Sequence, residues 1–254
     1  MSKFLIQYAS NLFVHQNHTL KQSQYLLKTS VCPNLALLGN IGNPRSQKTK
    51  DFIRWCSDNW EQVYCVPGPT ELMHEDRLNG LFTHFPKNVH ILDQSEKLVN
   101  QDLLLIGCPL WSGWADEIEM LRDWSEDERY FMANRVPNHI RHWHEEDVEF
   151  IAEKLRYNEA VFGDSRKVVL LTHNLYDARM MSLGREGHEN RNLYLSDGKI
   201  RHLTTLNLKG VLCGAGGGTH TGYYGNAMAV VNGAFHGPNM VPNPQYRNDA
   251  VLRI

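Results

Sequence analysis

The sequence lacks a long apolar run, a paired-cysteine motif and an excess of one charge. No stretch approaches the roughly 20 apolar residues that a membrane-spanning helix needs. Residues 1–10 contain a single basic side chain, so we expect no secretory signal. The 26 basic and 28 acidic residues give a formal charge of −2, which provides no general attraction to nucleic acid or to an anionic membrane. These absences favour an intracellular, cytosol-like protein without a membrane span.

The cysteines are odd in number and widely spaced. The five are Cys32, Cys56, Cys65, Cys108 and Cys213. None belongs to a Cys-x-x-Cys pair, so neither a zinc ribbon nor a redox-active pair is expected. The sequence also has no Gly-x-Ser-x-Gly motif. We therefore expect reduced, mostly buried thiols and no serine or cysteine nucleophile.

Apolar runs typical of strands alternate with helical patterns along the chain. The strand-like runs are 4–9, 35–38, 63–66, 89–92, 103–107 and 167–172, followed by strands around a glycine-rich loop within 211–232. Helical patterns cover 47–60 and a stretch that starts at His144. This alternation predicts a layered α/β architecture. A chain of 254 residues with 42% apolar content can form one core, so we expect a single domain over residues 1–254.

The helix that starts at His144 has the clearest pattern. Residues 145–147 are acidic, which suits a first turn because the helix dipole favours negative charge there. Apolar residues then recur at helical spacing, at Val148, Ile151, Ala152 and Leu155. We expect the histidine-rich segment 139–144 to be a polar loop rather than a metal or nucleic-acid site. The acidic segment 115–135 favours an amphipathic helix, and residues 193–200 favour a hairpin that turns at Asp-Gly.

Five short segments, each after an apolar run, carry the functional information. They are Ser-Asn-Leu-Phe at 10–13, Leu-Gly-Asn-Ile-Gly-Asn-Pro at 38–44, Val-Pro-Gly-Pro-Thr-Glu at 66–71, Leu-Thr-His at 171–173 and Gly-Gly-Thr-His at 217–220. Their order and flanks resemble the calcineurin-like metallophosphoesterase superfamily, and the resemblance extends over residues 4–239. It implies a sandwich of two mixed β-sheets flanked by helices. In that family the segments carry the ligands of a two-metal site at the strand ends.

Most of the family's ligands are replaced in this chain. The family motifs are Asp-x-His, Gly-Asp, Gly-Asn-His-Asp/Glu, a lone His and Gly-His-x-His. The ligand and proton-donor positions that differ here hold Asn11, Phe13, Asn40, Pro69, Thr70 and Gly218. The two residues that match are His173 and His220. The resemblance therefore implies a degenerate member of the superfamily.

The replacements remove the negative charge that a two-metal site needs. Two divalent ions repel each other, and carboxylates, one of them bridging, offset that repulsion. Asn40 is neutral and cannot act as an anionic bridge. We expect no catalytic residue, no metal ligand and no cofactor. The first hypothesis is a pseudoenzyme that serves as a binding, structural or assembly module, with a protein partner or self-association through 115–135 or 11–21.

Two alternatives remain open. A metal-dependent phosphoesterase could use a remodelled, mononuclear site with one weakly held Mn²⁺ or Zn²⁺. Its ligands would be His173 and His220 with one of His15, His18 or His74. A metal-free binder of phosphate or nucleotide could instead use the old cleft. The candidate cleft residues are Asn11, Asn40, Asn43, Thr70, His173, Gly217 and His220.

Two further segments invite a site interpretation that we do not favour. Glu71 and His74 stand one helical turn apart, but no third metal ligand is evident, so we expect a solvated first turn. The glycine-rich run 214–218 is not followed by Gly-Lys-Ser/Thr. We expect a reshaped loop there rather than a phosphate-binding loop.

Overall fold

The computed structural model describes residues 3–16, 19–29, 31–72, 85–111, 137–175, 207–214, 219–224, 227–236 and 241–254. The first half of this part contains β1 (Leu5–Ala9), η1 (Val14–Gln16), α1 (Leu20–Gln24), β2 (Asn34–Leu38), α2 (Gln47–Asn59), β3 (Gln62–Val66), α3 (Pro69–Leu72), β4 (Val89–Ile91), β5 (Ser95–Asn100) and β6 (Leu103–Cys108). The second half contains α5 (Pro137–Phe162), η3 (Gly163–Ser165), β7 (Lys167–Thr172), β8 (Leu208–Cys213), β9 (Thr219–Tyr224), β10 (Ala227–Asn232), β11 (Phe235–His236), β12 (Val241–Pro242) and β13 (Val251–Arg253).

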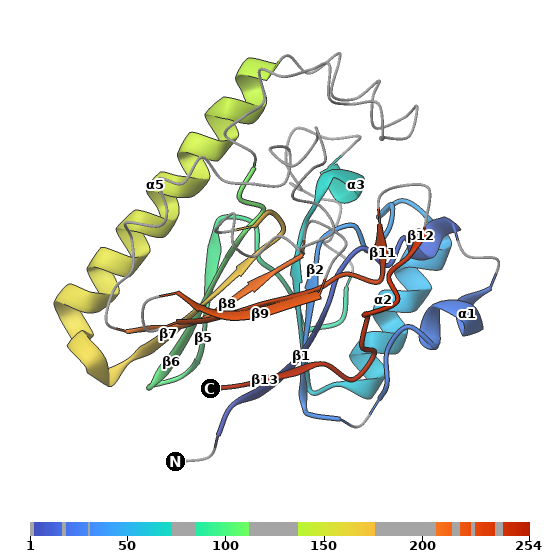
Figure 1. The fold of residues 1–254 in the computed structure, drawn as a ribbon, viewed down its shortest axis with the longest axis horizontal. Coiled ribbons are helices and arrows are strands. Elements are labelled where there is room, and N and C mark those ends of the chain that lie inside the picture. The colour runs from blue at the N-terminus through green and yellow to red at the C-terminus, as the bar shows by residue number, and fades with distance from the viewer. Residues whose placement is uncertain are drawn as a thin grey trace.

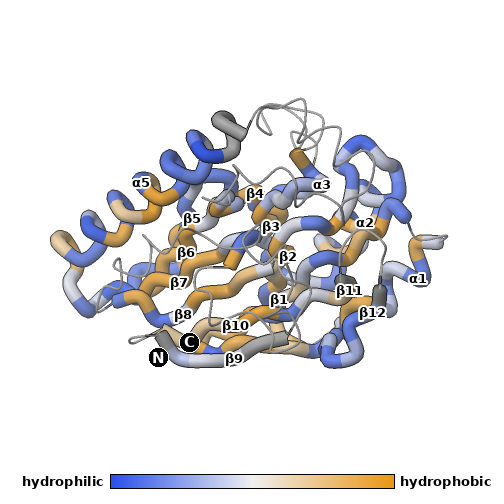
Figure 2. Tube along the Cα trace, turned by 45° about the horizontal axis from the view of Figure 1, so that its top comes forward, coloured by the Kyte–Doolittle hydropathy of each residue, from blue (hydrophilic) through white to orange (hydrophobic). Residues whose placement is uncertain are grey.

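Two mixed β-sheets pack face to face and carry helices on their outer faces. The five-stranded sheet has the order β13-β1-β2-β3-β4, and the six-stranded sheet has the order β5-β6-β7-β8-β10-β9. Helix α5 lies along the six-stranded sheet, and α2 lies on the opposite side of the molecule (Figure 1). The tube view shows the strands of both sheets as the apolar interior (Figure 2). The predicted sandwich of two mixed sheets with flanking helices is confirmed.

Strand β2 shows why the buried strands read as continuous apolar runs. Leu35 and Leu37 belong to the cluster with Phe52 of α2, whereas Leu38 belongs to the cluster between the two sheets. Successive side chains of a strand point to opposite faces, so a strand covered on both faces must be apolar at every position. The runs predicted as strands at 4–9, 35–38, 63–66 and 167–172 are strands for this reason.

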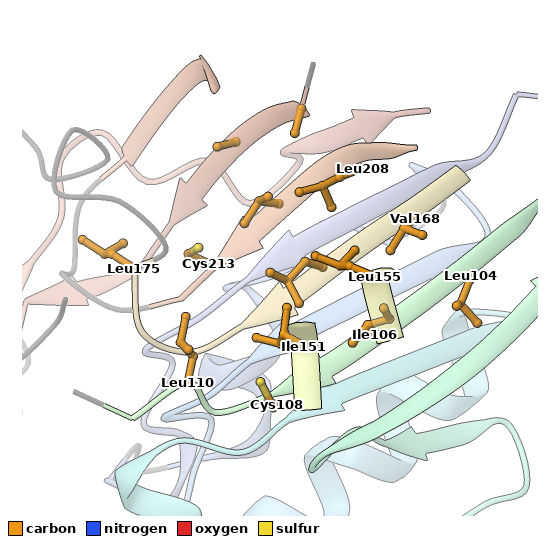
Figure 3. Packing of buried hydrophobic residues seen from close by; sticks show 14 of the residues in the cluster. Leu104, Ile106, Cys108, Leu110, Ile151, Leu155, Val168, Leu175, Leu208 and Cys213 are labelled. Atoms are coloured by element: carbon orange, nitrogen blue, oxygen red, sulfur yellow. The ribbon is translucent and has the colours of Figure 1, made fainter. Parts of the chain in front are cut away.

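Helix α5 begins earlier than its sequence pattern predicts. Ile151 and Leu155 pack on the six-stranded sheet against residues such as Ile106, as expected (Figure 3). The helix starts at Pro137, however, so the expectation that 139–144 forms a polar loop is wrong. Tertiary contacts accompany the extension: the rings of Trp143 and Trp111 lie 5.4 Å apart between centroids, and the buried imidazole of His144 donates from Nδ1 to the carbonyl oxygen of Trp111. The sequence does not show that a polar side chain will have a buried hydrogen-bond partner, so it does not predict this part of the helix.

Strand β5 was not foreseen, because its composition is polar. Its residues alternate between half-buried and exposed, and it pairs antiparallel with β6 at one edge of the six-stranded sheet. A capping box of Thr19 and Gln22 begins helix α1, which no sequence pattern described above predicts. The segments 115–135 and 193–200 lie outside the described residues. Among the described helices, none is both long enough and apolar enough to cross a membrane.

Candidate functional site at the strand ends

The carboxyl ends of the parallel strands bring four of the singled-out residues to one edge of the sandwich. Strands β1, β2 and β3 run parallel, and so do β6, β7 and β8. Asn11 follows β1, Asn40 follows β2, Thr70 follows β3 and His173 follows β7. Such an edge is where open α/β sheets place their ligand sites. The structure therefore assembles these sequence candidates at one end of the fold.

A chain of hydrogen bonds joins the loops after β3, β2, β1 and β8. The backbone N–H of Thr70 donates to Oδ1 of Asn40 over 3.0 Å, and Nδ2 of Asn40 donates to Oδ1 of Asn11 over 3.1 Å. Nδ2 of Asn11 then donates to the carbonyl oxygen of Gly214 over 3.0 Å. The hydroxyl of Ser10 donates to the same oxygen over 2.7 Å. We call the side chains of Asn11 and Asn40 the amide pair.

The amide pair stands on strained backbone. Asn11 and Asn40 have φ angles of 52° and 54°, and Phe13 has a φ of 44°. Asparagine tolerates this left-handed region better than other residues with a side chain beyond Cβ, because its short amide bonds locally. Phe13 is 2% exposed, and its N–H donates to the carbonyl oxygen of Asn40. The loops after β1 and β2 thus hold each other through both backbone and side chains.

His173 is buried, and its hydrogen bond defines its tautomer. Its Nδ1–H donates to the carbonyl oxygen of Leu38 over 2.9 Å, so in the neutral ring Nε2 carries the lone pair. Burial lowers the pKa of His173 to about 4, and the bond to Leu38 opposes that decrease. The ring is tightly enclosed, since a Cβ at Gly39 would lie 2.2 Å from Nδ1 and one at Gly68 would lie 3.0 Å from it. Gly39 also has a φ of 79°, which glycine adopts without strain.

The surroundings of Glu71 differ most from those that its sequence context predicts. Glu71 is 5% exposed rather than solvated. Its Oε2 accepts from the N–H groups of Gly68 and Asn40, over 2.7 Å and 2.9 Å. Its Oε1 accepts from those of Ile41 and Gly42, over 2.7 Å and 3.0 Å. Burial raises the pKa of the Glu71 carboxyl, and the four backbone hydrogen bonds oppose that rise.

Asn43 and His15 form hydrogen bonds in the same loop after β2. The N–H of Asn43 donates to Nδ1 of His15 over 3.3 Å, and Oδ1 of Asn43 accepts from the N–H of Arg45 over 2.9 Å. Burial, and then the charge of Lys48, lowers the pKa of His15. Both side chains thus stabilise the turn into α2.

The remaining candidates contribute less to the described geometry. Pro69 begins the short helix α3. His220 lies on β9, where it pairs with Val231 of β10. The candidates His18, His74, Gly217 and Gly218 lie outside the described residues. Among the described residues, no three or more His, Cys, Asp or Glu side chains gather in an arrangement that could hold a metal ion.

Ser10 and Gly214 belong to this site although sequence reasoning did not single them out. A Cβ on Gly214 would lie 1.8 Å from the carbonyl oxygen of Leu38, so the loop after β8 touches the end of β2. The sequence clues to them were the segment 10–13, which begins with Ser10, and the glycine-rich run that starts at Gly214.

Comparisons with known proteins bear on the fold. No protein-family model matches the chain. A curated relative, the uncharacterized protein L509 of Acanthamoeba polyphaga mimivirus, is 24% identical over 160 residues, covering 55% of this chain and 54% of its own. The chain thus spans about half the length of the curated relative it matches.

Solved structures resemble the whole sandwich. The phosphopantetheinyl hydrolase of Mycobacterium tuberculosis matches with a TM-score of 0.60 at 12% identity, over 95% of this chain and 97% of its own. A putative 5'-nucleotidase from Staphylococcus aureus gives 0.51 at 10% identity over 91% and 49%, and a dimetal phosphatase from Danio rerio gives 0.50 at 10% identity over 94% and 89%. The fold is that of metallophosphoesterase structures.

Proposed function

We propose that this chain uses the metallophosphoesterase fold as a binding or structural module and does not catalyse phosphoester hydrolysis. The observation that carries the proposal is the amide pair. Where the resemblance implies two acidic metal ligands, Asn11 and Asn40 bond to each other and to backbone groups.

Charge is the physical reason that this arrangement disfavours a two-metal centre. Each divalent ion needs negative ligands to offset the repulsion of its neighbour. The amide pair supplies none, and its Oδ1 atoms already accept the N–H of Thr70 and the Nδ2–H of Asn40. A metal would compete with these bonds and would gain only neutral oxygens as ligands. The residues present do not fit a dinuclear centre.

The nearby carboxylate of Glu71 does not compensate for this loss. Both of its oxygens accept two backbone N–H groups each. Turning Glu71 toward a metal would leave four buried donors unsatisfied, at a cost of about 1–3 kcal/mol each.

A module role requires a partner, and we propose a protein partner or a second copy of this chain. Helix α5 offers one described place to test it, because Tyr157 and Val161 are one turn apart and are 62% and 53% exposed. Mixed-copy pull-down with Tyr157→Ser/Val161→Ser as the variant addresses this surface directly.

A mononuclear metal site is the second candidate, and His173 favours it. Its Nδ1–H is fixed on the carbonyl oxygen of Leu38, so Nε2 has the lone pair that a metal needs. The lowered pKa keeps the ring neutral at physiological pH. One nitrogen does not make a site, however, because stable zinc sites use three or four ligands.

A metal-free binder of phosphate or nucleotide is the third candidate. The hydroxyl of Thr70 is buried and has no hydrogen-bond partner among the described residues, so a polar ligand could use it. Against an anion, His173 is neutral and the amide pair is engaged internally. A thermal-shift panel of phosphate and nucleotides tests it, since any ligand of the folded state must raise the unfolding temperature.

The deciding experiment is elemental mass spectrometry of untagged protein incubated with Mn²⁺ and Zn²⁺ and then desalted, together with a phosphoester hydrolysis panel. The control is the restored chain Asn11→Asp, Phe13→His, Asn40→Asp, Pro69→Asn, Thr70→His and Gly218→His. We expect metal uptake by the restored chain and only a trace in the native one, with no hydrolysis. One or two tightly held equivalents in the native chain, with hydrolysis that disappears in His173→Asn/His220→Asn, would overturn the proposal in favour of the metal-dependent alternative.

A further inference from the structure

Four backbone N–H groups from two loops converge on one carboxylate. Three are consecutive, from Asn40, Ile41 and Gly42 after β2, and the fourth comes from Gly68 after β3. We call these four groups the amide nest. Consecutive N–H groups that point to one side form a concavity with positive partial charge, which binds anions. Asn40 has a left-handed φ of 54°, and nests of successive N–H groups contain left-handed residues.

The carboxylate of Glu71 fills the nest in its ionised form. Every described hydrogen bond to its two oxygens comes from an N–H donor. A protonated carboxyl would present an O–H to these donors, because it is a donor itself at that oxygen. No Lys or Arg within 4.0 Å pairs with Glu71 among the described residues. The backbone thus supplies the compensation for this buried charge.

The nest also fixes the position of the candidate site. Asn40 contributes its N–H to the nest and its side chain to the amide pair. Gly68 contributes to the nest and packs against the ring of His173. Thr70, whose N–H bonds the amide pair, directly precedes Glu71. Any movement of the Glu71 carboxylate would therefore displace the loops after both β2 and β3.

We infer that the loops after β2 and β3 form a carboxylate-binding site whose resident ligand is the side chain of Glu71, and that this internal anion holds the strand-end loops in shape without a metal. The inference stands apart from the proposed function, because it concerns the loops that carry the site rather than what the site binds. The ligand class that we assign to the nest is small carboxylates. Such a molecule could enter the nest from solution when the side chain of Glu71 is truncated.

The test is chemical rescue of the full chain carrying Glu71→Ala. Acetate has the size and charge of the group that this substitution removes. We expect Glu71→Ala to lower Tm, and sodium acetate to raise it again by about 2–4 °C or more relative to sodium chloride of equal ionic strength. Acetamide, which is neutral and has the same shape, should give no rise. Equal effects of acetate and acetamide, or no rise with acetate, would overturn the inference.

A matched control comes from Asp147, a second buried carboxylate. It accepts from the side chain of Gln94 and, over 3.4 Å, from the N–H of Trp111. Acetate should raise the Tm of Asp147→Ala much less than that of Glu71→Ala, because the donors described for Asp147 are one side-chain amide and one backbone N–H rather than four converging backbone N–H groups. An equal rise would mean a general salt effect and would overturn the inference.

If Glu71→Ala does not fold, the variant Glu71→Gln tests the inference instead. Its amide nitrogen would face two N–H donors of the nest, so we expect a lower Tm and faster hydrogen exchange at residues 40–42 and 68. Unchanged Tm and unchanged exchange would show that the nest does not need a charged resident, and the inference would then be wrong.

Discussion

The two sheets contribute unlike halves to the strand-end site. The five-stranded sheet contributes Asn11, Asn40 and Thr70, whose polar groups are largely bonded to one another and to backbone. The six-stranded sheet contributes His173, whose Nδ1 is fixed by Leu38 and whose Nε2 is the lone-pair nitrogen of a neutral ring. The first half has the shape of a ligand site with its chemistry satisfied internally. Among its described residues, the second half keeps one group suited to a ligand, the His173 ring.

The contrast between the two halves indicates that the shape of the loops and the chemistry available to a ligand depend on different residues. The shape of the strand-end loops depends on the glycines and on the Glu71 carboxylate, which accepts from the loop backbone. Chemistry follows from the side chains at the strand ends. Substitutions can therefore separate the two, and the largest effect is expected where the two halves touch.

Gly214→Ala should have the largest effect, because Gly214 is the contact between the halves. A Cβ there would lie 1.8 Å from the carbonyl oxygen of Leu38, which is backbone and cannot move aside. We expect a loss of about 4 kcal/mol in the free energy of unfolding, measured by denaturant titration. Gly163→Ala is the control, since its Cβ would have nothing within 4 Å and only its φ of 51° costs about 1–2 kcal/mol. Equal losses in the two variants would contradict the contact.

His173 should make stability depend on pH. Its pKa falls from 6.5 to about 4 on folding, so between these values the unfolded chain binds a proton that the folded chain does not. Stability is therefore complete above pH 6.5 and is lost as pH falls toward 4, by roughly 3 kcal/mol in total.

The measurement is the free energy of unfolding from pH 7 to pH 4 in the native chain and in His173→Asn. Asparagine keeps a donor for the carbonyl oxygen of Leu38 but does not titrate in this range. The variant should lack this part of the pH dependence. Parallel curves for the two proteins would show that His173 is not the titrating group.

Asn40→Asp should reduce the difference between the two halves, because it adds a negative charge to the half that the five-stranded sheet contributes. The N–H of Thr70 still finds an acceptor, but the second carboxylate oxygen would face Oδ1 of Asn11, where Nδ2 of Asn40 donated before. We expect a loss of about 2 kcal/mol without metal, part of which Mn²⁺ restores. Asn40→Ala loses both of these side-chain bonds and gains no charge, so Mn²⁺ should not stabilise it. A metal response in Asn40→Ala, or none in Asn40→Asp, would contradict this account.

The strands could be predicted because their signals are local, whereas the two-sheet sandwich and the position of the site followed from the resemblance of the five segments. Strands β1, β2, β3 and β7 are apolar at nearly every position, since both of their faces are covered. The extension of α5 before His144 and the edge strand β5 could not be predicted, because tertiary contacts stabilise polar segments there.

The role of Glu71 shows the same limit within the site. A carboxylate in a first turn reads as solvated unless its surroundings are known. Its four donors come from residues 40–42, which lie far away in sequence, and from Gly68. Gly39 and Asn40, by contrast, are residue types that adopt positive φ, and both do so in this loop.

Thr70→Val should have the smallest effect. Within the part of the chain that the structure describes, the buried hydroxyl of Thr70 has no hydrogen-bond partner, so a methyl group of similar shape removes an unmet polar group and loses no described bond. The N–H that bonds Asn40 is backbone and stays. We expect the free energy of unfolding to change by no more than about 0.5 kcal/mol. A loss well above 1 kcal/mol would mean that a water or a ligand bonds this hydroxyl in solution, and the first half of the site would then be open to ligands after all.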